Sequence, residues 1–402
     1  MRLKEICDYI SRGTTPDYVD ESPYKVMNQA TFSKGWLDES NLRYTSKNVR
    51  EAQIKKGDLL MASTGGGVLG KVFFFDSDDT SFYADSHVSI LRNSKGKSLM
   101  KYLYYVFSIK YDEINATMVK GSTNQTELQR NYLLAYELDM PPLSKQQRIV
   151  DYLDEKLGNI DARIAVLEKQ QDAYARLKKS IIYHTVTRGL NSNVSLKDSG
   201  VDWIGMIPEH WELRRFKSIF TECKSITQTG EENLLSVSEY YGVARRIDKM
   251  EDGEYESRAN SLIGYKVCKK NDLVINIMLA WKRGLGFSNF DGIVSPANAV
   301  YRGKNIVPHY FHYLMRTDMY VTEYKRNSKG IIDSRLRMYT DRFNNIMSIF
   351  PPIPEQQTIA DYLDEKCSKI DAAIENIGKQ INALKRLKRA LINEVITGQR
   401  AV

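Results

Sequence analysis

Paired cysteines are missing from this sequence. Its four cysteines are scattered, and no two of them form a Cys-x-x-Cys pair: Cys7, Cys223, Cys268 and Cys367. A disulfide framework and a zinc knuckle both need such spacing, so neither is indicated. We expect all four side chains to be buried, reduced thiols.

Long apolar runs are missing too. The longest, Leu273 to Trp281, falls far short of the ~18 residues of a membrane helix, and the first residues lack the apolar run of a secretory signal. We therefore expect a cytoplasmic protein without membrane contact. The chain has 402 residues, 42% hydrophobic and 27% charged, which suits two domains of about 150 residues. Its net charge of +8, from 58 Lys and Arg against 50 Asp and Glu, permits a nucleic-acid partner without requiring one.

The sequence contains only incomplete matches to known catalytic motifs. The run Gly65 to Val72 resembles a phosphate-binding loop, but Val72 stands where a Ser or Thr hydroxyl must hold magnesium. Phe73 to Phe75 then continues as a strand where a helix should receive the phosphates. A glycine hairpin within a sheet is the favoured interpretation. The proline pairs after Met140 and Phe350 lack the preceding Asn or Asp of amino-methyltransferases.

Two histidine patterns are equally weak. His309 and His312 have one-turn spacing, but the internal repeat described below aligns them with Lys101 and Tyr104, so amphipathic helix residues are favoured over a metal pair. Asp85, Ser86 and His87 are adjacent, and as strand residues they would alternate faces and could not converge as a triad. We predict no catalytic centre, no metal site and no cofactor in this chain.

One segment occurs twice, 210 residues apart. Residues 141–187 align without a gap to residues 351–397, with 23 identities in 47 positions. Both copies open with a proline pair and then show a helix start signal. In the first copy Ser144 and Gln147 match a capping box. In the second, Pro354 suits the first turn, and Glu355 favours the positive end of the helix dipole.

Apolar residues recur in both copies with a spacing of three and four, which predicts a coiled-coil seam. They are Leu153, Leu157, Ile160, Ile164 and Leu167 in the first, and Leu363, Cys367, Ile370, Ile374, Ile377, Ile381 and Leu384 in the second. Each run lasts about 40 residues, to a glycine near Gly189 or Gly398, or roughly 60 Å of helix. Because such a rod does not fit inside one small core, we expect the two helices to pack on each other, most simply antiparallel.

The rest of the chain repeats more faintly. Gly57-Asp58-Leu59-Leu60 resembles Asn271-Asp272-Leu273-Val274, and Lys101 to Tyr105 resembles His309 to Tyr313. β-branched and aromatic runs such as Lys71 to Phe75 and Leu273 to Met278 alternate with turn residues, which indicates curved sheet with two or three short flanking helices in each unit. The predicted fold is α+β, with two β-rich globular units, two long antiparallel coiled-coil helices and an internal pseudo-two-fold repeat. The predicted boundaries are 1–140 for the first unit, 141–190 for the first long helix, 191–202 for a linker, 203–350 for the second unit and 351–402 for the second long helix.

Both globular units carry polar loops with basic, amide and hydroxyl side chains, which reach phosphates and base edges. Any one such residue is more often part of a solvated loop, but recurrence at matching places favours DNA contact for the group. The candidates are Arg12, Thr14, Thr15, Lys120, Ser122, Thr123, Asn124 and Gln125 in the first unit, and Lys224, Gln228, Trp281, Lys282, Arg283, Lys329, Arg335 and Arg337 in the second.

Several motifs in combination resemble the specificity subunit of type I restriction-modification systems. They are the Pro-Pro-Leu/Ile-x-x-Gln-Gln-x-Ile helix start, the Leu-Asp-Glu-Lys and Ile-Asp-Ala that follow it, Trp203 to Trp211, and Asp291 to Pro296. The resemblance covers nearly the whole chain. One departure is that the first unit starts directly at Met1 and lacks the Ile-Pro-Glu-His-Trp run of the second.

The resemblance implies that the globular units are target-recognition domains, each reading one half of a bipartite, asymmetric sequence in double-stranded DNA. It also implies that the helices fix the gap between the halves and dock two methyltransferase subunits, through which restriction and motor subunits join. S-adenosylmethionine, ATP and Mg are then expected in those partners, and this chain is expected to be non-catalytic.

This interpretation explains the duplicated segment. Two methyltransferase subunits are alike, so one chain must offer their docking surface twice, whereas the recognition units must differ to read different half-sites. Two other hypotheses stay open at this point. A self-contained enzyme such as a nuclease would cleave or methylate DNA without partners, and a coiled-coil scaffold that never meets DNA would give no gel shift with the methyltransferase present.

Overall fold

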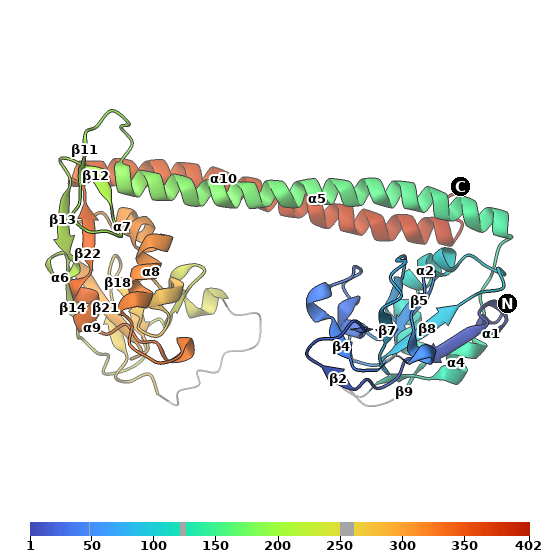
Figure 1. The fold of residues 1–402 in the computed structure, drawn as a ribbon. Coiled ribbons are helices and arrows are strands. Elements are labelled where there is room, and N and C mark those ends of the chain that lie inside the picture. The colour runs from blue at the N-terminus through green and yellow to red at the C-terminus, as the bar shows by residue number, and fades with distance from the viewer. Residues whose placement is uncertain (48, 121–125, 250–260) are drawn as a thin grey trace. The chain divides into compact units, whose positions relative to one another are not determined.

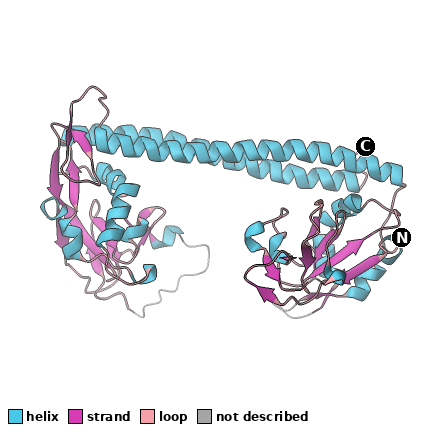
Figure 2. Cartoon of the chain, in the orientation of Figure 1, coloured by secondary structure: helices cyan, strands magenta, loops and turns pink. Residues whose placement is uncertain are grey.

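The computed structural model describes residues 1–47, 49–120, 126–249 and 261–402 (Figure 1). The chain divides into two compact units: unit 1 comprises Met1–Glu168 and Lys379–Val402, and unit 2 comprises Lys169–Gly378. Each unit therefore contains one globular region and part of each long helix, α5 (Leu143–Arg188) and α10 (Ile353–Ile396). Both globular regions mix helix and strand (Figure 2). Among the described helices, none is long and apolar enough to cross a membrane.

The globular part of unit 1 is built from short elements. Its strands are β1 (Tyr9–Arg12), β2 (Tyr18–Val19), β3 (Lys25–Met27), β4 (Arg43–Thr45), β5 (Leu59–Ala62), β6 (Val72–Phe74), β7 (Phe82–Ala84), β8 (Val88–Arg92), β9 (Val119–Lys120) and β10 (Glu127–Leu128). Its helices are α1 (Leu3–Ile6), α2 (Met100–Ser108), α3 (Tyr111–Thr117) and α4 (Arg130–Ala135), with 3-10 turns η1 (Gln29–Thr31), η2 (Glu39–Asn41) and η3 (Arg50–Ala52).

The globular part of unit 2 is built in a similar way. Its strands are β11 (Leu196–Asp198), β12 (Met206–Pro208), β13 (Glu212–Arg215), β14 (Phe220–Cys223), β15 (Leu235–Ser238), β16 (Gly242–Arg245), β17 (Lys266–Cys268), β18 (Leu273–Asn276), β19 (Leu285–Phe287), β20 (Gly292–Val294), β21 (Asn298–Gly303) and β22 (Met347–Phe350). Its helices are α6 (Phe216–Ile219), α7 (Pro308–Met315), α8 (Asp318–Asn327) and α9 (Thr340–Asn345), with 3-10 turns η4 (Arg246–Lys249), η5 (Ala280–Lys282) and η6 (Asp333–Arg335).

A four-stranded antiparallel sheet in the order β1-β8-β5-β6 forms the centre of unit 1. Successive side chains of a strand point to opposite faces, and both faces of β5 are covered. Leu59 and Met61 pack with α1 and α2, whereas Leu60 and Ala62 pack toward the second sheet, ordered β2-β4-β3-β7. Every residue of β5 is therefore buried.

The central sheet of unit 2 has the corresponding order, β14-β21-β18-β19. Leu273 and Ile275 of β18 join one core and Val274 joins another, so this strand is also covered on both faces. The strands expected within Lys71 to Phe75 and Leu273 to Met278 are confirmed as β6 and β18.

An ion pair beside the central strand recurs in both units. The Asp58 carboxylate binds the Arg92 guanidinium at 2.6–2.7 Å and accepts from the Lys55 backbone N–H at 2.7 Å. In unit 2, Asp272 binds Arg302 at 3.0–3.1 Å and accepts from the backbone N–H of residue 269 at 2.9 Å. The two aspartates are nearly fully buried. A charge-assisted bidentate pair thus links the residue before β5 to β8 in unit 1, and the residue before β18 to β21 in unit 2.

Each long helix starts directly after a proline pair, and the predicted capping box is wrong. Helix α5 begins at Leu143, so Ser144 already lies in the first turn, and the Gln147 side chain donates to Asp151 at 2.7 Å instead of reaching back. The expected C-terminal glycines are confirmed. Gly189 and Gly398 both have φ of +77°, which suits the residue that follows a helix.

A buried glutamine joins each helix to its globular region. Gln146 accepts from the Leu99 backbone N–H at 3.0 Å and donates to the Pro141 carbonyl at 2.8 Å. Gln356 accepts from the Val307 N–H at 3.0 Å and donates to the Pro351 carbonyl at 2.8 Å. The same side chain therefore ties the helix start to the start of α2 in one unit and α7 in the other.

The residues predicted to form the helix seam are largely buried. Leu153, Leu157, Ile164, Leu167, Leu363, Cys367, Ile370, Ile377 and Ile381 are buried, and Ile160, Ile374 and Leu384 are half-buried. In unit 1, Lys388 binds Asp161 at 2.6 Å and Lys385 lies 3.9 Å from Glu168, so ascending positions in α5 face descending positions in α10. In unit 2, Lys178 binds Asp371 at 2.5 Å. The facing segments of unit 1 are thus antiparallel.

The last turns of α10 close onto the first globular region. Leu391, Ile392 and Val395 share one core with Leu3 and Ile6 of α1. The N-terminal ammonium donates to the carbonyl of residue 138 at 2.8 Å. Residues of α1 thus pack on the last turns of a long helix.

That run has its own helix contact in unit 2. Trp211 is fully buried, and its indole N–H donates to the Glu355 carboxylate at 2.8 Å, while the His210 ring lies 2.6 Å from the other Glu355 oxygen. Part of the predicted linker 191–202 is strand, because β11 pairs with β12. This hairpin joins the polar linker to the apolar segment Met206–Pro208, a pairing that the composition of the linker alone does not indicate.

All four cysteines are free thiols. Cys7, Cys268 and Cys367 are buried as predicted, whereas Cys223 is only half-buried. Burial raises the pKa of Cys7 and of Cys268 to about 12, so both thiols are protonated at neutral pH.

We predict that Gln356→Leu destabilises unit 2 by about 1–3 kcal/mol, because an apolar side chain of similar size leaves the Val307 N–H and the Pro351 carbonyl without partners. Urea denaturation followed by tryptophan fluorescence measures this, since Trp203, Trp211 and Trp281 lie in unit 2 and only Trp36 lies in unit 1.

Gln357→Leu is the matched control. The Gln357 side chain is exposed and bonds Asp361 on its own helix, so we expect a change within about 0.5 kcal/mol. Equal destabilisation by both substitutions would show that Gln356 does not anchor the helix.

Candidate nucleic-acid interface

A closed loop in unit 2 carries three of the predicted DNA-binding residues. Its two arms meet where Lys329 and Arg337 exchange backbone hydrogen bonds, both of 2.9 Å. Lys325 of α8 binds Asp333 within the loop at 3.1 Å. Lys329 and Arg335 are exposed, and Arg337 is half-buried with its guanidinium donating to the carbonyl of residue 336. We call residues 329–337 the basic loop.

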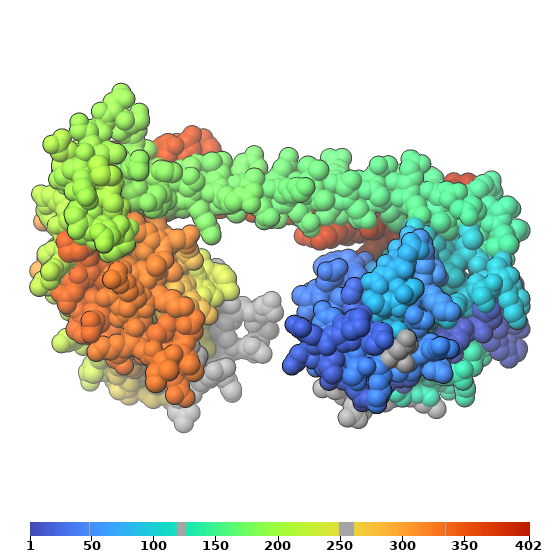
Figure 3. All heavy atoms as spheres, in the orientation of Figure 1, coloured from blue at the N-terminus to red at the C-terminus, as the bar shows by residue number. Residues whose placement is uncertain are grey.

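Trp281 links this loop to the turn η5. The Trp281 indole N–H donates to the Met278 carbonyl at 3.0 Å, which fixes the half-buried ring. The ammonium groups of Lys282 and Lys325 lie 5.0 and 5.1 Å from its centroid, within cation–π range. Side chains of the segment around α7 and α8, coloured orange, lie at the centre of the face of unit 2 that Figure 3 shows. The structure thus brings Trp281 and Lys282 to the basic loop through Lys325.

Arg283 is directed elsewhere. Its backbone is left-handed with φ of 64°, its side chain donates to the Arg316 carbonyl at 3.0 Å, and it forms an ion pair with Asp318. It lines a cavity of about 700 Å³ together with Lys178, Arg316 and other residues. To contact DNA as predicted, Arg283 would have to exchange its ion pair with Asp318 for a phosphate or a base.

Lys224 and Gln228 follow β14 and are both exposed. Thr227 between them is buried, and its hydroxyl donates to Glu232 at 2.7 Å. This segment is attached to β17, through hydrogen bonds that join residue 227 to 265 and 267 to 225. The two candidates are thus held on the sheet and point outward from it.

In unit 1 two of the candidates, Arg12 and Lys120, lie at the hairpin β9–β10. The Arg12 guanidinium binds Glu127 at 2.5 Å and donates to the Leu128 carbonyl at 3.0 Å. Lys120 pairs with Glu127 through the backbone. Thr14 is half-buried beside Asp85, and Thr15 is exposed. Ser122, Thr123, Asn124 and Gln125 lie outside the described residues.

The two units differ in charge at this place. In β1 Tyr9 pairs with Arg92, and in β14 Thr221 pairs with Arg302. Arg92 and Arg302 are the equivalent arginines of the two Asp–Arg pairs, so Tyr9 corresponds to Thr221. Three residues later in each sequence, Arg12 therefore corresponds to Lys224. The hairpin of unit 1 offers Glu127 to its cation, whereas Arg337 closes the basic loop of unit 2 at the matching bridge. Unit 1 thus pairs Arg12 with Glu127 at this place, whereas unit 2 exposes Lys224 and Lys329.

The glycine-rich run is a hairpin, as predicted. Residues 63–71 connect β5 to the antiparallel β6, and no helix follows. His309 and His312 are confirmed as helix residues, in α7. His309 contacts Asp364 at 3.0 Å, while burial lowers the pKa of His312 to about 4. Within the described part of the chain, no cluster of three metal-ligating side chains occurs.

The expectation that Asp85, Ser86 and His87 are strand residues is wrong. They form the turn between β7 and β8, where the Asp85 carboxylate accepts from the His87 backbone N–H at 2.8 Å. The His87 ring contacts Thr64 at 2.7 Å rather than Ser86. A tight Asx turn thus accounts for the tripeptide.

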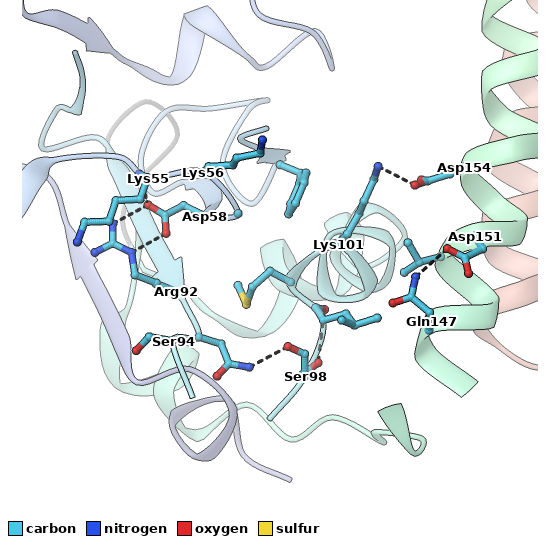
Figure 4. Close-up of a pocket in the computed structure, with 16 residues that line it drawn as sticks. Lys55, Lys56, Asp58, Arg92, Ser94, Ser98, Lys101, Gln147, Asp151 and Asp154 are labelled. Carbon is cyan, nitrogen blue, oxygen red and sulfur yellow. Dashed lines mark hydrogen bonds and ion pairs between the residues drawn. The ribbon is translucent and has the colours of Figure 1, made fainter. Parts of the chain in front are cut away.

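A groove of about 580 Å³ lies between the globular part of unit 1 and the first turns of α5 (Figure 4). Gln147, Asp151 and Asp154 line it from the helix, and Lys56 and Lys101 line it from the globular side. Lys101 binds Asp154 at 2.7 Å. In unit 2, His309 and Asp364 line a smaller cavity of about 230 Å³ at the corresponding place.

Sequence reasoning missed several residues of these surfaces. Lys325 reaches the basic loop from α8, and Glu127 neutralises Arg12 from 115 positions away. Neither pairing has a local signal. The two isoleucines that follow Gly330 are an available signal, since adjacent apolar residues are unexpected in a polar loop.

Residues 1–173 match the family described as type I restriction modification DNA specificity domain. The chain is 21% identical over 420 aligned positions to the type I restriction enzyme MjaVIII specificity subunit of Methanocaldococcus jannaschii, covering 99% of this chain and 92% of that protein. It is 26% identical to the putative MjaX specificity subunit of the same organism, over 52% of this chain and about half of that relative's length. The EcoBI specificity subunit of Escherichia coli is 22% identical over 74% of this chain and 65% of its own.

Solved structures share the fold. A chain from a study of complex assembly and conformational transition of the type I R-M system aligns with a TM-score of 0.68 at 15% identity, covering 98% of this chain and 96% of its own. The HsdS subunit from Thermoanaerobacter tengcongensis aligns with a TM-score of 0.51 at 15% identity, covering 100% and 96%. Both support the α+β fold, and all these curated relatives are named as specificity subunits, in agreement with the expected non-catalytic role. The chain is therefore similar to type I restriction-modification specificity subunits along most of its length, and its residues 1–173 match the DNA specificity domain of that family.

Proposed function

We propose that this chain gives a type I restriction-modification complex its DNA sequence specificity by reading a bipartite, asymmetric target, one half with each globular unit. The observation that carries this proposal is a pair of matching loop regions with different chemistry. The hairpin β9–β10 and the basic loop occupy corresponding places beside sheets of the same strand order, yet their charged residues differ. A common scaffold with divergent loops is what two different half-sites require.

We predict that exchanging residues 1–140 for the corresponding unit of another specificity subunit changes one half-site and leaves the other intact. The reason is that the recognition loops lie in the globular units, while the helices are common to both. Methylation mapping of the hybrid complex measures the outcome. The reciprocal exchange of residues 203–350 serves as the control and should change the opposite half-site. Hybrids in which both half-sites change, or neither, would contradict the proposal.

The helix starts are the proposed docking surfaces for two methyltransferase subunits. Between positions 143 and 159 of α5, eight positions are exposed in both copies of the repeat. Only three of these carry the same residue in both: Gln147, Asp151 and Glu155 match Gln357, Asp361 and Glu365. They are four residues apart and therefore share one helix face. We call each set an acidic stripe.

Internal packing does not explain why the acidic stripes are identical. Gln147 bonds Asp151 at 2.7 Å and Gln357 bonds Asp361 at 2.8 Å, each within its own helix. An identical exposed surface presented twice fits a partner that binds twice. The chemistry suits a partner surface with Lys, Arg or amide donors.

We predict that Asp151→Lys with Glu155→Lys abolishes docking at one site, that Asp361→Lys with Glu365→Lys abolishes it at the other, and that the combined variant binds no methyltransferase. Charge reversal repels a cationic partner surface. Native mass spectrometry of the purified complex should count two, one, one and zero methyltransferase subunits for wild type and the three variants.

The matched control is Asn159→Lys, because the second copy already carries Lys369 at that position. It should retain two subunits. A combined acidic-stripe variant that still binds two subunits, with an unchanged circular dichroism spectrum, would refute docking at these stripes.

We further propose that the two helices set the spacer between the half-sites. Support comes from the length of α5, whose 46 residues span about 69 Å at ~1.5 Å per residue. The antiparallel ion pairs of unit 1 support a paired rod. S-adenosylmethionine, ATP and Mg are assigned to the methyltransferase and restriction subunits of the complex, since the proposal requires no chemistry from this chain.

We predict that inserting seven residues after both Ala173 and Asn376, which line one groove of unit 2, lengthens the preferred spacer by about three base pairs. Seven residues add about 10 Å of helix and preserve the heptad seam, and duplex DNA rises ~3.4 Å per base pair. Methylation of a DNA library with fixed half-sites and varied spacers measures the shift.

Inserting two residues at both positions is the control, because it rotates the distal seam by about 200° and should prevent assembly. An unchanged spacer preference in a fully assembled seven-residue variant would show that the helices do not set the gap.

A further inference from the structure

Two adjacent isoleucines stand at the tip of the basic loop with their side chains in solvent. Ile331 is 100% exposed and Ile332 is 53% exposed. Single exposed apolar residues are common on protein surfaces. Two adjacent exposed isoleucines at the tip of a tethered loop both lack the favourable free energy of apolar burial. Packing within the unit does not explain their exposure.

The loop is held in place without using these side chains. Gly330 has φ of +153°, and a Cβ at this position would lie 2.6 Å from the Arg335 carbonyl oxygen, so only glycine lets the arms approach. Backbone hydrogen bonds close the base at Lys329, and a 2.8 Å bond joins the Arg335 N–H to the Ile332 carbonyl. The apolar tip is therefore presented by a fixed scaffold.

Cations surround the tip. Lys329 and Arg335 flank it in the sequence and are exposed, and Lys325 lies at the loop through Asp333. A partner that binds this surface must present negative charge to the cations. It must also present an apolar region that the two isoleucines can contact. Duplex DNA has this chemistry, with phosphates at the groove edges and stacked bases between them.

We propose that Ile331 and Ile332 form an apolar wedge that enters a groove of the half-site read by unit 2 and inserts at a base step, while Lys329 and Arg335 bind the flanking phosphates. The proposal rests on the DNA-reading function proposed above. Branched aliphatic side chains are among those that proteins insert between base steps. In the sequence, the residues after Lys120 in unit 1 are Gly-Ser-Thr-Asn-Gln, so the wedge belongs to one half-site only.

The first test compares the wild-type complex with a complex carrying Ile331→Ser and Ile332→Ser, using DNA that contains the target found by methylation mapping. Both side chains are exposed, so the variant should melt at the wild-type temperature. We expect at least a ten-fold weaker dissociation constant for the target with an unchanged salt slope. Lys329→Ala with Arg335→Ala should instead lower the slope of log K against log salt by about two. Leu196→Ser, an exposed aliphatic residue of β11, is the control and should bind as wild type.

The second test locates the insertion with 2-aminopurine placed at successive positions of that half-site. The methylated base is left out, because methyltransferases take their target base out of the stack. The wild-type complex should raise the fluorescence at one base step, and the isoleucine variant should not.

The two ways to fail are distinguishable. A wild-type complex that binds its mapped target no better than unrelated DNA would overturn the proposed function itself. A wild-type complex that prefers its target, together with an isoleucine variant of equal affinity and equal fluorescence pattern, would overturn the wedge alone.

Discussion

The junction between each globular region and its long helix is the constraint on which the rest of the structure depends. A buried glutamine side chain, Gln146 or Gln356, satisfies a backbone N–H of the globular region and a proline carbonyl at the helix start. Two turns later Asp154 or Asp364 receives a second contact from α2 or α7. Because two points along a rigid helix are tied to one globular region, the direction in which that region faces is fixed. Any loop on the region then has a defined position relative to its helix.

This constraint explains which parts of the two halves can differ. The sheet order, the Asp–Arg pair beside the central strand and the glutamine junction recur because each maintains the frame that carries the loops. The loops themselves do not contribute to these contacts. Glu127 can neutralise Arg12 in one unit while Arg337 adds positive charge in the other, without any change in the frame. The loop side chains are thus separate from the contacts that orient each globular region.

Sequence reasoning succeeded where the signal was long and periodic. The helices α5 and α10 were predictable because an apolar spacing of three and four over about 40 residues is typical of a long packed helix, and the glycines at their ends need a left-handed backbone. The capping box failed because the helix starts two residues earlier than that box requires, directly after the proline pair, which moves Ser144 into the first turn. Candidate site residues were found by type, and Lys329, Arg335 and Arg337 do lie on one loop. The contacts of Lys325 with Asp333 and of Glu127 with Arg12 were not found, because they form through tertiary folding that no local pattern records.

The same distinction bears on how such a protein changes its target. A loop that closes on backbone hydrogen bonds and one glycine, as the basic loop does at Lys329 and Gly330, tolerates new side chains at its tip because its conformation does not depend on them. Exposed substitutions there cost little stability. Under the proposed docking, the acidic stripes have the opposite character, since one kind of partner would bind both, and a change in one copy alone would make the two surfaces unequal. We therefore expect sequence variation to accumulate at the loop tips while the helix faces stay alike. The 23 identities between the two helix copies agree with this expectation.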